Sequence, residues 1–370
     1  MKSACHLGFG WQDRAMRRAR WLAPWKDSAV KPAMYHCISR VVDRRFVFGA
    51  GEREKFRMFM RMQENFSGCR VLSYCIMSNH FHLLLEVPPM SAGGIPDEEL
   101  LKRLSAIYTE AAVAVVAKEL ADARKTGNQS HVEEIHARYS YRMHNLSEFM
   151  KALLIRFTRW FNRTQNRRGT LWEERFKSVI VESGIAARTM AAYIDLNPVR
   201  AGIVADPAEY RWSSYGEAVG GGTKGNGKKA RAGLVRACMS HQGCGFEAEK
   251  WQEVSRIYRR AMGLALVGKS GRAQVEKGVV RPQMNTAEAL EHGVTDTPLA
   301  GIGMAAMLRH RVRYFTDGAV IGSKAFVNEA FAGARERFTA KRKDGARAMR
   351  GGASGAKGLL WSMRDLRTGV

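Results

Sequence analysis

The 370-residue sequence has little that would place it at a membrane or in an oxidising compartment. It contains no run of about 18 apolar residues, which a membrane-spanning helix needs, and its N-terminus lacks the apolar segment of a signal peptide. Its six cysteines lack Cys-x-x-Cys spacing and are few for this length, so we expect reduced thiols in the cytoplasm. Cys238, His241 and Cys244 are close in sequence, but no fourth zinc ligand is evident, which favours ordinary loop residues over a zinc site.

Acidic residues are scarce relative to basic ones. Lys and Arg number 60 against 35 Asp and Glu, which gives a net charge of +25 and an isoelectric point near 10.2. Such a balance favours a polyanionic partner, with binding that weakens as the salt concentration rises. The alternative is that the excess charge only keeps the protein soluble, because net charge bears on association and not on fold.

Two histidines separated by one residue, His80 and His82, stand at the start of an apolar stretch. Residues 81–87 are apolar apart from His82 and Glu86, and Pro88 follows, a pattern typical of a mostly buried strand. Side chains two residues apart on a strand share one face. Both imidazoles should therefore point the same way and could hold a metal ion, although strand histidines are often held by ordinary hydrogen bonds.

A second block places a phenol and an amide one helical turn apart. Residues 185–197 are predicted to form a helix that ends before Pro198, and on it Tyr193 and Asn197 share a face. Two histidine nitrogens are too few for a closed structural site, as expected for a catalytic metal with open positions. Tyr193 is then a candidate nucleophile and Asn197 a candidate third ligand. The rival interpretations are a core tyrosine and a residue that ends the helix.

A phenolate can attack a phosphodiester to form a covalent phosphotyrosine, with a divalent cation polarising the phosphoryl oxygens. Four blocks between about residues 33 and 215 occur in the order found in a family with this chemistry. These blocks are Tyr-His-Cys-Ile-Ser-Arg at 35–40, Met-Ser-Asn-His-Phe-His-Leu-Leu at 77–84, Gly-Thr-Leu-Trp-Glu-Glu-Arg-Phe-Lys-Ser at 169–178 and the segment at 193–202. Through them the chain resembles the HUH single-tyrosine transposases, specifically the REP-associated tyrosine transposase group.

The resemblance implies a transposase-like endonuclease that cuts single-stranded or hairpin DNA and leaves a 5′-phosphotyrosine and a free 3′-hydroxyl. His80 and His82 match the metal-binding histidines of the family, with Mg²⁺ or Mn²⁺ as the ion. Tyr193 matches the nucleophile, and Asn197 matches the polar residue that can complete the metal site. Such a protein is expected in the cytoplasm, associated with the nucleoid, as a monomer or a homodimer.

Two other functions are compatible with this kind of domain. A domesticated protein could bind hairpin DNA without transposing, but every matched catalytic position is retained here. A replication initiator or relaxase would order its motifs differently and add a helicase or primase domain. The sequence has no Walker-type phosphate loop, which argues against that alternative.

Basic residues recur beside aromatic ones on the helix predicted over residues 146–162. Arg156, Arg159 and Arg163 form a stripe at intervals of three or four residues, next to Trp160. We expect this stripe to hold DNA through phosphate contacts and base stacking, and the alternative is a solvated helix face. Further candidates for phosphate contacts are Arg175, Lys177 and Arg200.

The spacing of apolar residues predicts an α+β fold. The expected elements are strands at 34–42, 69–77, 81–87 and 175–182 and helices at 51–66, 146–162 and 185–197. Their order is β-α-β-β-α-β followed by the nucleophile helix, which is the ferredoxin-like arrangement of an antiparallel sheet with its helices on one face. A basic C-terminal extension follows this unit.

Composition divides the chain into five regions. We expect a basic N-terminal extension at 1–32, an HUH transposase domain at 33–218 with a helical insertion at about 94–145, a flexible Gly/Lys linker at 219–233, a basic accessory region at 234–340 and a disordered tail at 341–370.

Overall fold

The computed structural model describes residues 20–222, 224–239, 250–266, 274–276, 279–281, 313–349 and 360–363. Most of the expected N-terminal extension, His241, Cys244 and parts of the accessory region and tail lie outside these residues. None of the described helices is both long and apolar enough to cross a membrane. The described cysteines, which are Cys37, Cys69, Cys75 and Cys238, carry free thiols.

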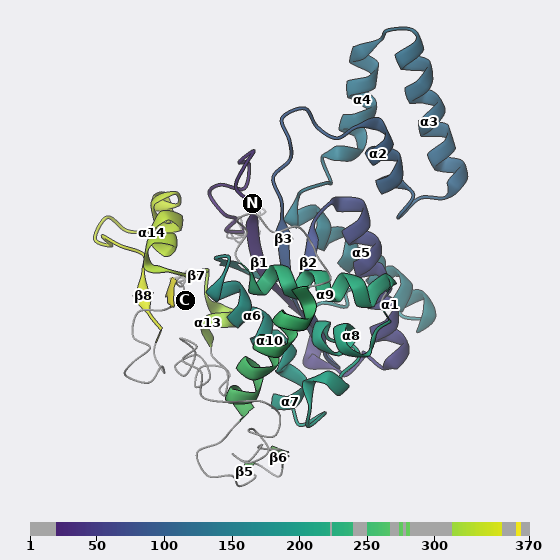
Figure 1. The fold of residues 1–370 in the computed structure, drawn as a ribbon. Helices are drawn as coiled ribbons and strands as arrows, with labels where there is room; N and C mark the ends of the chain where they lie inside the picture. Colours follow the sequence, from purple (N-terminus) through teal and green to yellow (C-terminus); the bar gives the residue numbers. More distant parts are fainter. Residues whose placement is uncertain are drawn as a thin grey trace, which may run out of the picture.

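An antiparallel sheet of four strands, with two helices, forms the first half of the fold (Figure 1). Its elements in chain order are β1 (Ala33–Arg40), the short helix η1 (Val42–Arg44), α1 (Ala50–Ser67), β2 (Arg70–Ile76), β3 (His80–Val87), α5 (Leu146–Thr164) and β4 (Lys177–Val181). The strands lie in the order β2-β3-β1-β4, and each neighbouring pair is antiparallel. The ferredoxin-like β-α-β-β-α-β unit predicted from the sequence is confirmed.

One face of this sheet packs against α1 and α5. Alternate residues of β3, namely Phe81, Leu83 and Leu85, are fully buried in this layer, as the two-residue period of a strand requires. Aromatic rings of the helices meet them there. The ring centroid of Phe56 is 4.6 Å from that of Phe81 and 5.2 Å from that of Phe157. The histidines of β3 are therefore left to the opposite face of the sheet.

The opposite face is covered by helices that follow the ferredoxin-like unit in the chain, and the expected nucleophile helix is one of them. The covering elements are α6 (Ile185–Asp195), α7 (Asn197–Arg200), η2 (Pro207–Glu209), α8 (Ser214–Gly220), α9 (Gly225–Cys238) and α10 (Trp251–Leu266). Met190 of α6 and Leu234 of α9 are fully buried in one apolar cluster with Leu84 of β3. Apolar side chains on both faces of β3 make a second helical layer necessary.

Helix α9 occupies most of the segment expected to be a flexible linker at residues 219–233. Gly233 lies so close to β2 that a Cβ atom would stand 2.5 Å from the carbonyl oxygen of Val71. Arg236 donates through two nitrogens to the buried carboxylate of Glu86 on β3. A helix with a small residue at the contact can approach a strand closely even when it has few large apolar side chains. The linker expectation is therefore wrong.

The C-terminal part of the chain extends the same sheet. Its elements are β5 (Gln274–Glu276), β6 (Val279–Arg281), α13 (Arg313–Asp317), β7 (Val320–Gly322), α14 (Lys324–Ala332), η4 (Arg335–Arg337), β8 (Arg347–Ala348) and β9 (Trp361–Met363). β7 pairs in parallel with β4, and β9 and β8 follow, while β5 and β6 form a separate pair. The tail expected to be disordered at 341–370 thus supplies two strands to the main sheet, which corrects that expectation.

The charged insertion forms a helical arm that projects from the body (Figure 1). It consists of α2 (Asp97–Leu104), α3 (Glu110–Lys125) and α4 (Gln129–Ser140). Leu100, Leu120 and Ile135 belong to a small separate core, which reaches the body through Phe66 of α1. These helices lie within the insertion predicted at about residues 94–145, outside the two layers that cover the sheet.

Truncation after Ala218 is expected to prevent cooperative folding. The truncated chain would lack α9, β7 beside β4, and Arg236, the residue that donates two hydrogen bonds to buried Glu86, and the loss of one partner of a buried ion pair is strongly destabilising. Thermal unfolding followed by circular dichroism measures the effect. Truncation after Met363, which keeps every described element, is the control. The same cooperative transition in both proteins would show that the later elements are not part of the core.

Candidate active site

His80 and His82 project from the face of β3 that α6 covers. Their ring centroids are 5.1 Å apart. His82 is buried, with 3% of its surface exposed, whereas His80 at the strand end is half-buried. His82 lies opposite Ile38 of β1, and Ile38 lies opposite Lys177 of β4. The histidine pair and Lys177 therefore share one face of the sheet, with Lys177 about 10 Å from His82 across two strand spacings.

A chain of hydrogen bonds fixes the ring of His82. The carbonyl oxygen of Phe315 lies 2.7 Å from Nδ1 of His36, and Nε2 of His36 lies 3.0 Å from Nδ1 of His82. Because a carbonyl oxygen can only accept, Nδ1 of His36 must carry a proton. In the neutral ring, Nε2 of His36 is then the acceptor and His82 donates from Nδ1. This leaves a lone pair on Nε2 of His82, the form that binds a metal ion.

Burial keeps these two rings neutral. It lowers the pKa of His36 to about 4 and the pKa of His82 well below its usual value, and His80 and His36 lower the pKa of His82 further. The charged form of an imidazole loses its hydration when it is buried, which disfavours protonation. At neutral pH no proton therefore competes with a metal ion for Nε2 of His82.

Asn79 holds the ring of His80 in a similar way. Its Oδ1 lies 2.7 Å from Nδ1 of His80, and its Nδ2 donates to the carbonyl oxygen of Arg44 at 2.9 Å. The second bond decides which end of the amide faces the histidine. Because this amide oxygen can only accept, Nδ1 of His80 carries a proton and donates to it.

Helix α6 places the phenol of Tyr193 beside the histidines. The centroid of its ring is 6.0 Å from that of His82 and 6.1 Å from that of His36. The ring of Phe315 packs on it at 4.6 Å between centroids. The guanidinium of Arg200 lies over the Tyr193 ring, with 4.3 Å between Cζ and the centroid. The structure thus brings the candidate nucleophile, the histidine pair and one of the candidate phosphate contacts together.

Asn197 is the first residue of α7 and not the last turn of one continuous helix. Its Nδ2 donates to the carbonyl oxygens of Tyr193 at 3.2 Å and Ile194 at 3.1 Å. These bonds satisfy carbonyl groups at the end of α6, which is the rival role considered for this residue. Only Oδ1 of Asn197 could then serve as a metal ligand.

The donor set fits a divalent cation that keeps open coordination positions. His80 and His82 offer one nitrogen each, and the Asn197 amide oxygen is the remaining side-chain candidate. Among the residues that the structure describes, no group of three or more His, Cys, Asp or Glu side chains could hold a metal ion. The other ligands would have to be water and phosphate oxygens, which Mg²⁺ and Mn²⁺ accept readily.

The arginine stripe expected to bind DNA lines a groove on α5. Arg156, Arg159, Arg163 and Trp160 border a cavity of about 530 Å³ together with Lys55 of α1. Helices α1 and α5 cover the face of the sheet opposite to Tyr193. The structure therefore gathers the four predicted residues into one groove but separates that groove from the phenol by the thickness of the sheet.

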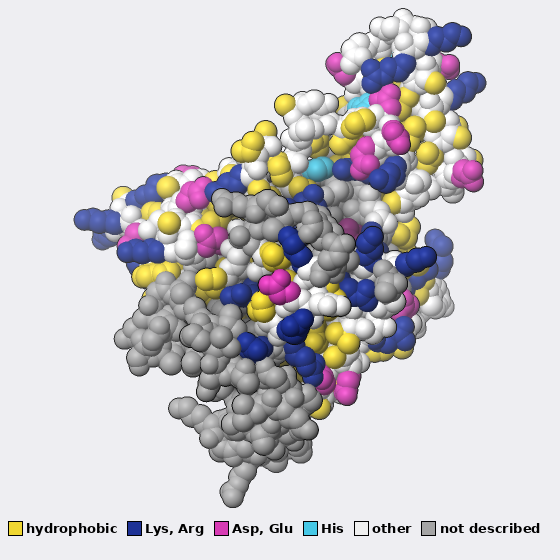
Figure 2. Space-filling view, in the orientation of Figure 1, with side chains coloured by type: hydrophobic (Ala, Val, Ile, Leu, Met, Phe, Trp, Pro, Cys, Tyr) yellow, Lys and Arg dark blue, Asp and Glu magenta, His cyan; other side chains and the backbone are white. Residues whose placement is uncertain are grey.

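The other candidate phosphate contacts are placed differently. Lys177 forms an ion pair with Glu174 at 3.0 Å, and Arg175 is exposed. In Figure 2, Lys and Arg side chains are scattered over the visible face and do not form one continuous patch. The hydrogen-bonding role of Phe315 carried no clear signal in the sequence, whereas His36 and Asn79 lie within the blocks at 35–40 and 77–84.

Residues 29–93 match the protein-family model described as IS200-like transposase. This segment carries His80 and His82, whereas Tyr193 and Asn197 lie beyond it. The match agrees with the family resemblance of the sequence blocks, over the part of the chain that holds the histidine pair. This part of the chain is similar to the IS200-like transposases.

None of the curated protein sequences matches the chain. A solved structure described as "Structure of the REP associates tyrosine transposase bound to a REP hairpin" is similar with a TM-score of 0.32 and 12% sequence identity. The similarity covers 57% of this chain and 90% of that one. The hairpin belongs to that structure, and at this TM-score the likeness carries no conclusion about the present chain.

Replacement of His36 by Leu is expected to weaken Mn²⁺ binding about 10- to 100-fold, because His82 loses the acceptor that orients its ring. His36→Gln is expected to keep most of the affinity, since its amide oxygen can accept from His82 while its nitrogen donates to the Phe315 carbonyl. Calorimetric titration with Mn²⁺ measures both variants, and thermal unfolding checks that each is folded. Equal affinities in the two folded variants would contradict the role of the hydrogen-bond chain.

Proposed function

We propose that the chain is a metal-assisted, transposase-like endonuclease that cuts single-stranded DNA at a hairpin or repeat and forms a covalent 5′-phosphotyrosine at Tyr193. The observation that carries this proposal is the Tyr193 ring 6.0 Å from the ring of His82. The match of residues 29–93 to the IS200-like transposases supports it. The ring of His36, which orients His82, lies 6.1 Å from the same phenol, measured between centroids.

The groups around the phenol account for the reaction. The Tyr193 oxygen bonds to phosphorus while the bond from phosphorus to the 3′-oxygen breaks. The phenolic proton passes to water, and the 3′-oxygen takes a proton from water and leaves as a hydroxyl. Arg200 favours the negative charge that develops beside the ring. His80 and His82 would hold a divalent cation, Mg²⁺ or Mn²⁺, which would polarise the phosphoryl oxygens.

DNA in this arrangement contacts both sides of the sheet. The α5 groove offers the phosphate contacts of Arg156, Arg159 and Arg163, and Lys177 and Arg200 lie on the side of the phenol. A duplex stem held along α5, with a single strand that passes round the end of the sheet to Tyr193, satisfies both sets of contacts. The net charge of +25 suits such an extended polyanion.

Tyr193→Phe is expected to abolish the covalent protein–DNA adduct while leaving DNA binding nearly unchanged, because only the nucleophilic oxygen is removed and the ring still packs on Phe315. Labelled hairpin oligonucleotides from the DNA that flanks the gene reveal the adduct on a denaturing gel. EDTA should also prevent adduct formation by the unaltered protein. DNA binding without any adduct in the unaltered protein would instead support a domesticated hairpin-binding protein.

Replacing Arg156, Arg159 and Arg163 together with Gln is expected to flatten the dependence of log affinity on log salt concentration by about two units. Each phosphate contact to a single strand contributes a slope of about −0.7, because it releases condensed counterions. Binding should weaken alike for any sequence, since phosphate contacts position DNA without specifying it. Fluorescence anisotropy at several salt concentrations measures the slope.

The matched control removes three exposed charges from the helical arm. It replaces Lys102, Lys118 and Lys125 with Gln and is expected to leave the slope close to that of the unaltered protein. If the two triple variants changed the slope equally, the α5 groove would be only a solvated helix face.

A further inference from the structure

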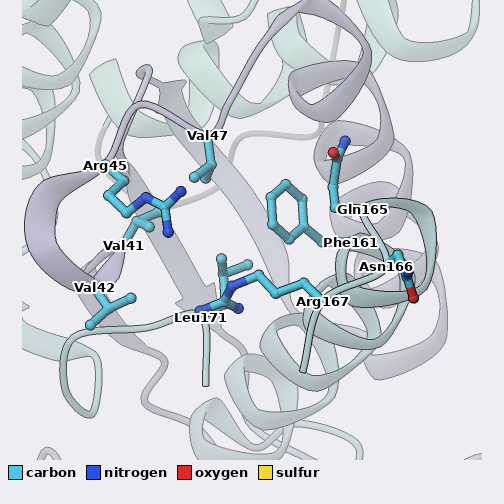
Figure 3. Close-up of a pocket in the computed structure, with 9 residues that line it drawn as sticks. All are labelled: Val41, Val42, Arg45, Val47, Phe161, Gln165, Asn166, Arg167 and Leu171. Carbon is cyan, nitrogen blue, oxygen red and sulfur yellow. The ribbon is translucent and has the colours of Figure 1, made fainter. Parts of the chain in front are cut away.

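A second cavity, of about 420 Å³, lies where β1 ends, between the loop after this strand and the segment after α5 (Figure 3). Val41, Val47, Phe161 and Leu171 give it apolar walls, and Arg45 and Arg167 reach it with their guanidinium groups. Its volume falls within the range of roughly 300–1,000 Å³ that is typical of small-ligand pockets. The cavity therefore combines an apolar interior with positive charge.

The charges of Arg45 and Arg167 favour an anion in this cavity. Figure 3 shows the two side chains extending toward the same part of it. Arg167 donates to neutral acceptors, which are Oδ1 of Asn162 at 3.0 Å and the carbonyl oxygen of Thr170 at 2.6 Å. These bonds fix the guanidinium without neutralising it. Two like charges directed at one cavity repel each other, and a bound anion would relieve this repulsion.

The backbone that borders the cavity is held in rarely populated conformations. Asp43 and Arg44, just before Arg45, have φ angles of 56° and 54°, and Asn166, just before Arg167, has a φ of 45°. Left-handed conformations outside glycine cost energy and cluster at ligand sites. In the same loop the ring of Phe46 is 80% exposed, and an exposed aromatic ring offers a stacking surface for a base.

One residue connects this cavity to the histidine pair. The backbone nitrogen of Val41 donates to the carbonyl oxygen of Asn79 at 2.9 Å. The side chain of Asn79 bonds the carbonyl oxygen of Arg44 with one end and Nδ1 of His80 with the other, at 2.9 and 2.7 Å. The loop that forms one wall of the cavity therefore also contacts, through Asn79, the candidate metal ligand His80.

We propose that this cavity holds one unpaired nucleotide of the DNA strand that passes the histidine pair. The base lies among Val47, Phe161 and Leu171, and its phosphate lies between Arg45 and Arg167. This inference rests on the proposed function, because the strand must pass the histidine pair. In this proposal the protein binds the strand through an extruded base as well as through phosphates.

The test measures binding of a DNA hairpin with an oligothymidylate flank on each side, in which one flank nucleotide at a time is made abasic. Binding is measured in EDTA, so that the DNA stays uncut. For the unaltered protein, one or two adjacent abasic positions are expected to weaken binding by about 5- to 150-fold, the range of base-stacking energies. If no flank position matters, the proposal is wrong.

A Val47→Trp variant fills the cavity and identifies the position of the base. This variant is expected to bind the intact hairpin as weakly as the unaltered protein binds the hairpin with the critical abasic position. In the variant, removing the base at that position should cause no further loss of affinity. Full additivity of the two changes would overturn the proposal. If Val47→Trp does not fold, Phe161→Leu, which shortens the apolar wall, takes its place. Its affinities for the intact and abasic hairpins are compared in the same way, and the same two outcomes support or overturn the proposal.

Arg45→Gln tests the phosphate contact separately. Arg45 is exposed, so its replacement should leave the fold intact and reduce the salt slope by about 0.7. Lys118→Gln on the arm removes the same charge and should leave the slope unchanged. An equal effect of both variants would contradict the contact. All these measurements concern binding, so they are independent of the adduct assay that tests the proposed function.

Discussion

The hydrogen bond from His36 to the carbonyl oxygen of Phe315 is the interaction on which the proposed site depends. It connects residues 279 positions apart, one on the first strand and one on a short helix of the C-terminal part. Through it, the proton positions of His36 and His82 are set before any ion binds. A cation then meets an oriented lone pair and not a ring that must first rotate. The C-terminal helix that carries Phe315 therefore contributes to the side of the sheet on which the histidines and Tyr193 lie.

A buried carboxylate fixes the helix that carries Tyr193. Asp195 accepts hydrogen bonds from the hydroxyl of Tyr258 at 2.7 Å and from the backbone nitrogen of Tyr215 at 3.0 Å. These bonds join α6 to α10 and α8. Burial raises the pKa of Asp195 to about 7, because the charged form loses its hydration. Helices α8 and α10 thus hold α6 in place, and the phenol of Tyr193 lies beside the histidines.

Local periodicity explains what the sequence could predict. The alternation of apolar residues in β3 placed His80 and His82 on one face, and the four-residue spacing on the second block placed Tyr193 and Asn197 on one helical face. The structure of segments whose apolar residues have no regular spacing was predicted wrongly. Helix α9 is rich in Gly and Lys, and tertiary contacts stabilise it, among them its close approach to β2 at Gly233 and the bonds from Arg236 to Glu86. Strands β7 and β9 have three residues each, too few for an alternating pattern to show. The bond to Phe315 depends on tertiary contact and has no local signature.

The ring nitrogens of His82 offer the most direct test of the account. In metal-free protein labelled with ¹⁵N-histidine, long-range proton–nitrogen spectra distinguish a protonated from an unprotonated ring nitrogen. We expect His82 and His36 both to be neutral at neutral pH, each with the proton on Nδ1 and the lone pair on Nε2. A proton on Nε2 of His82, or a doubly protonated ring at neutral pH, would contradict it.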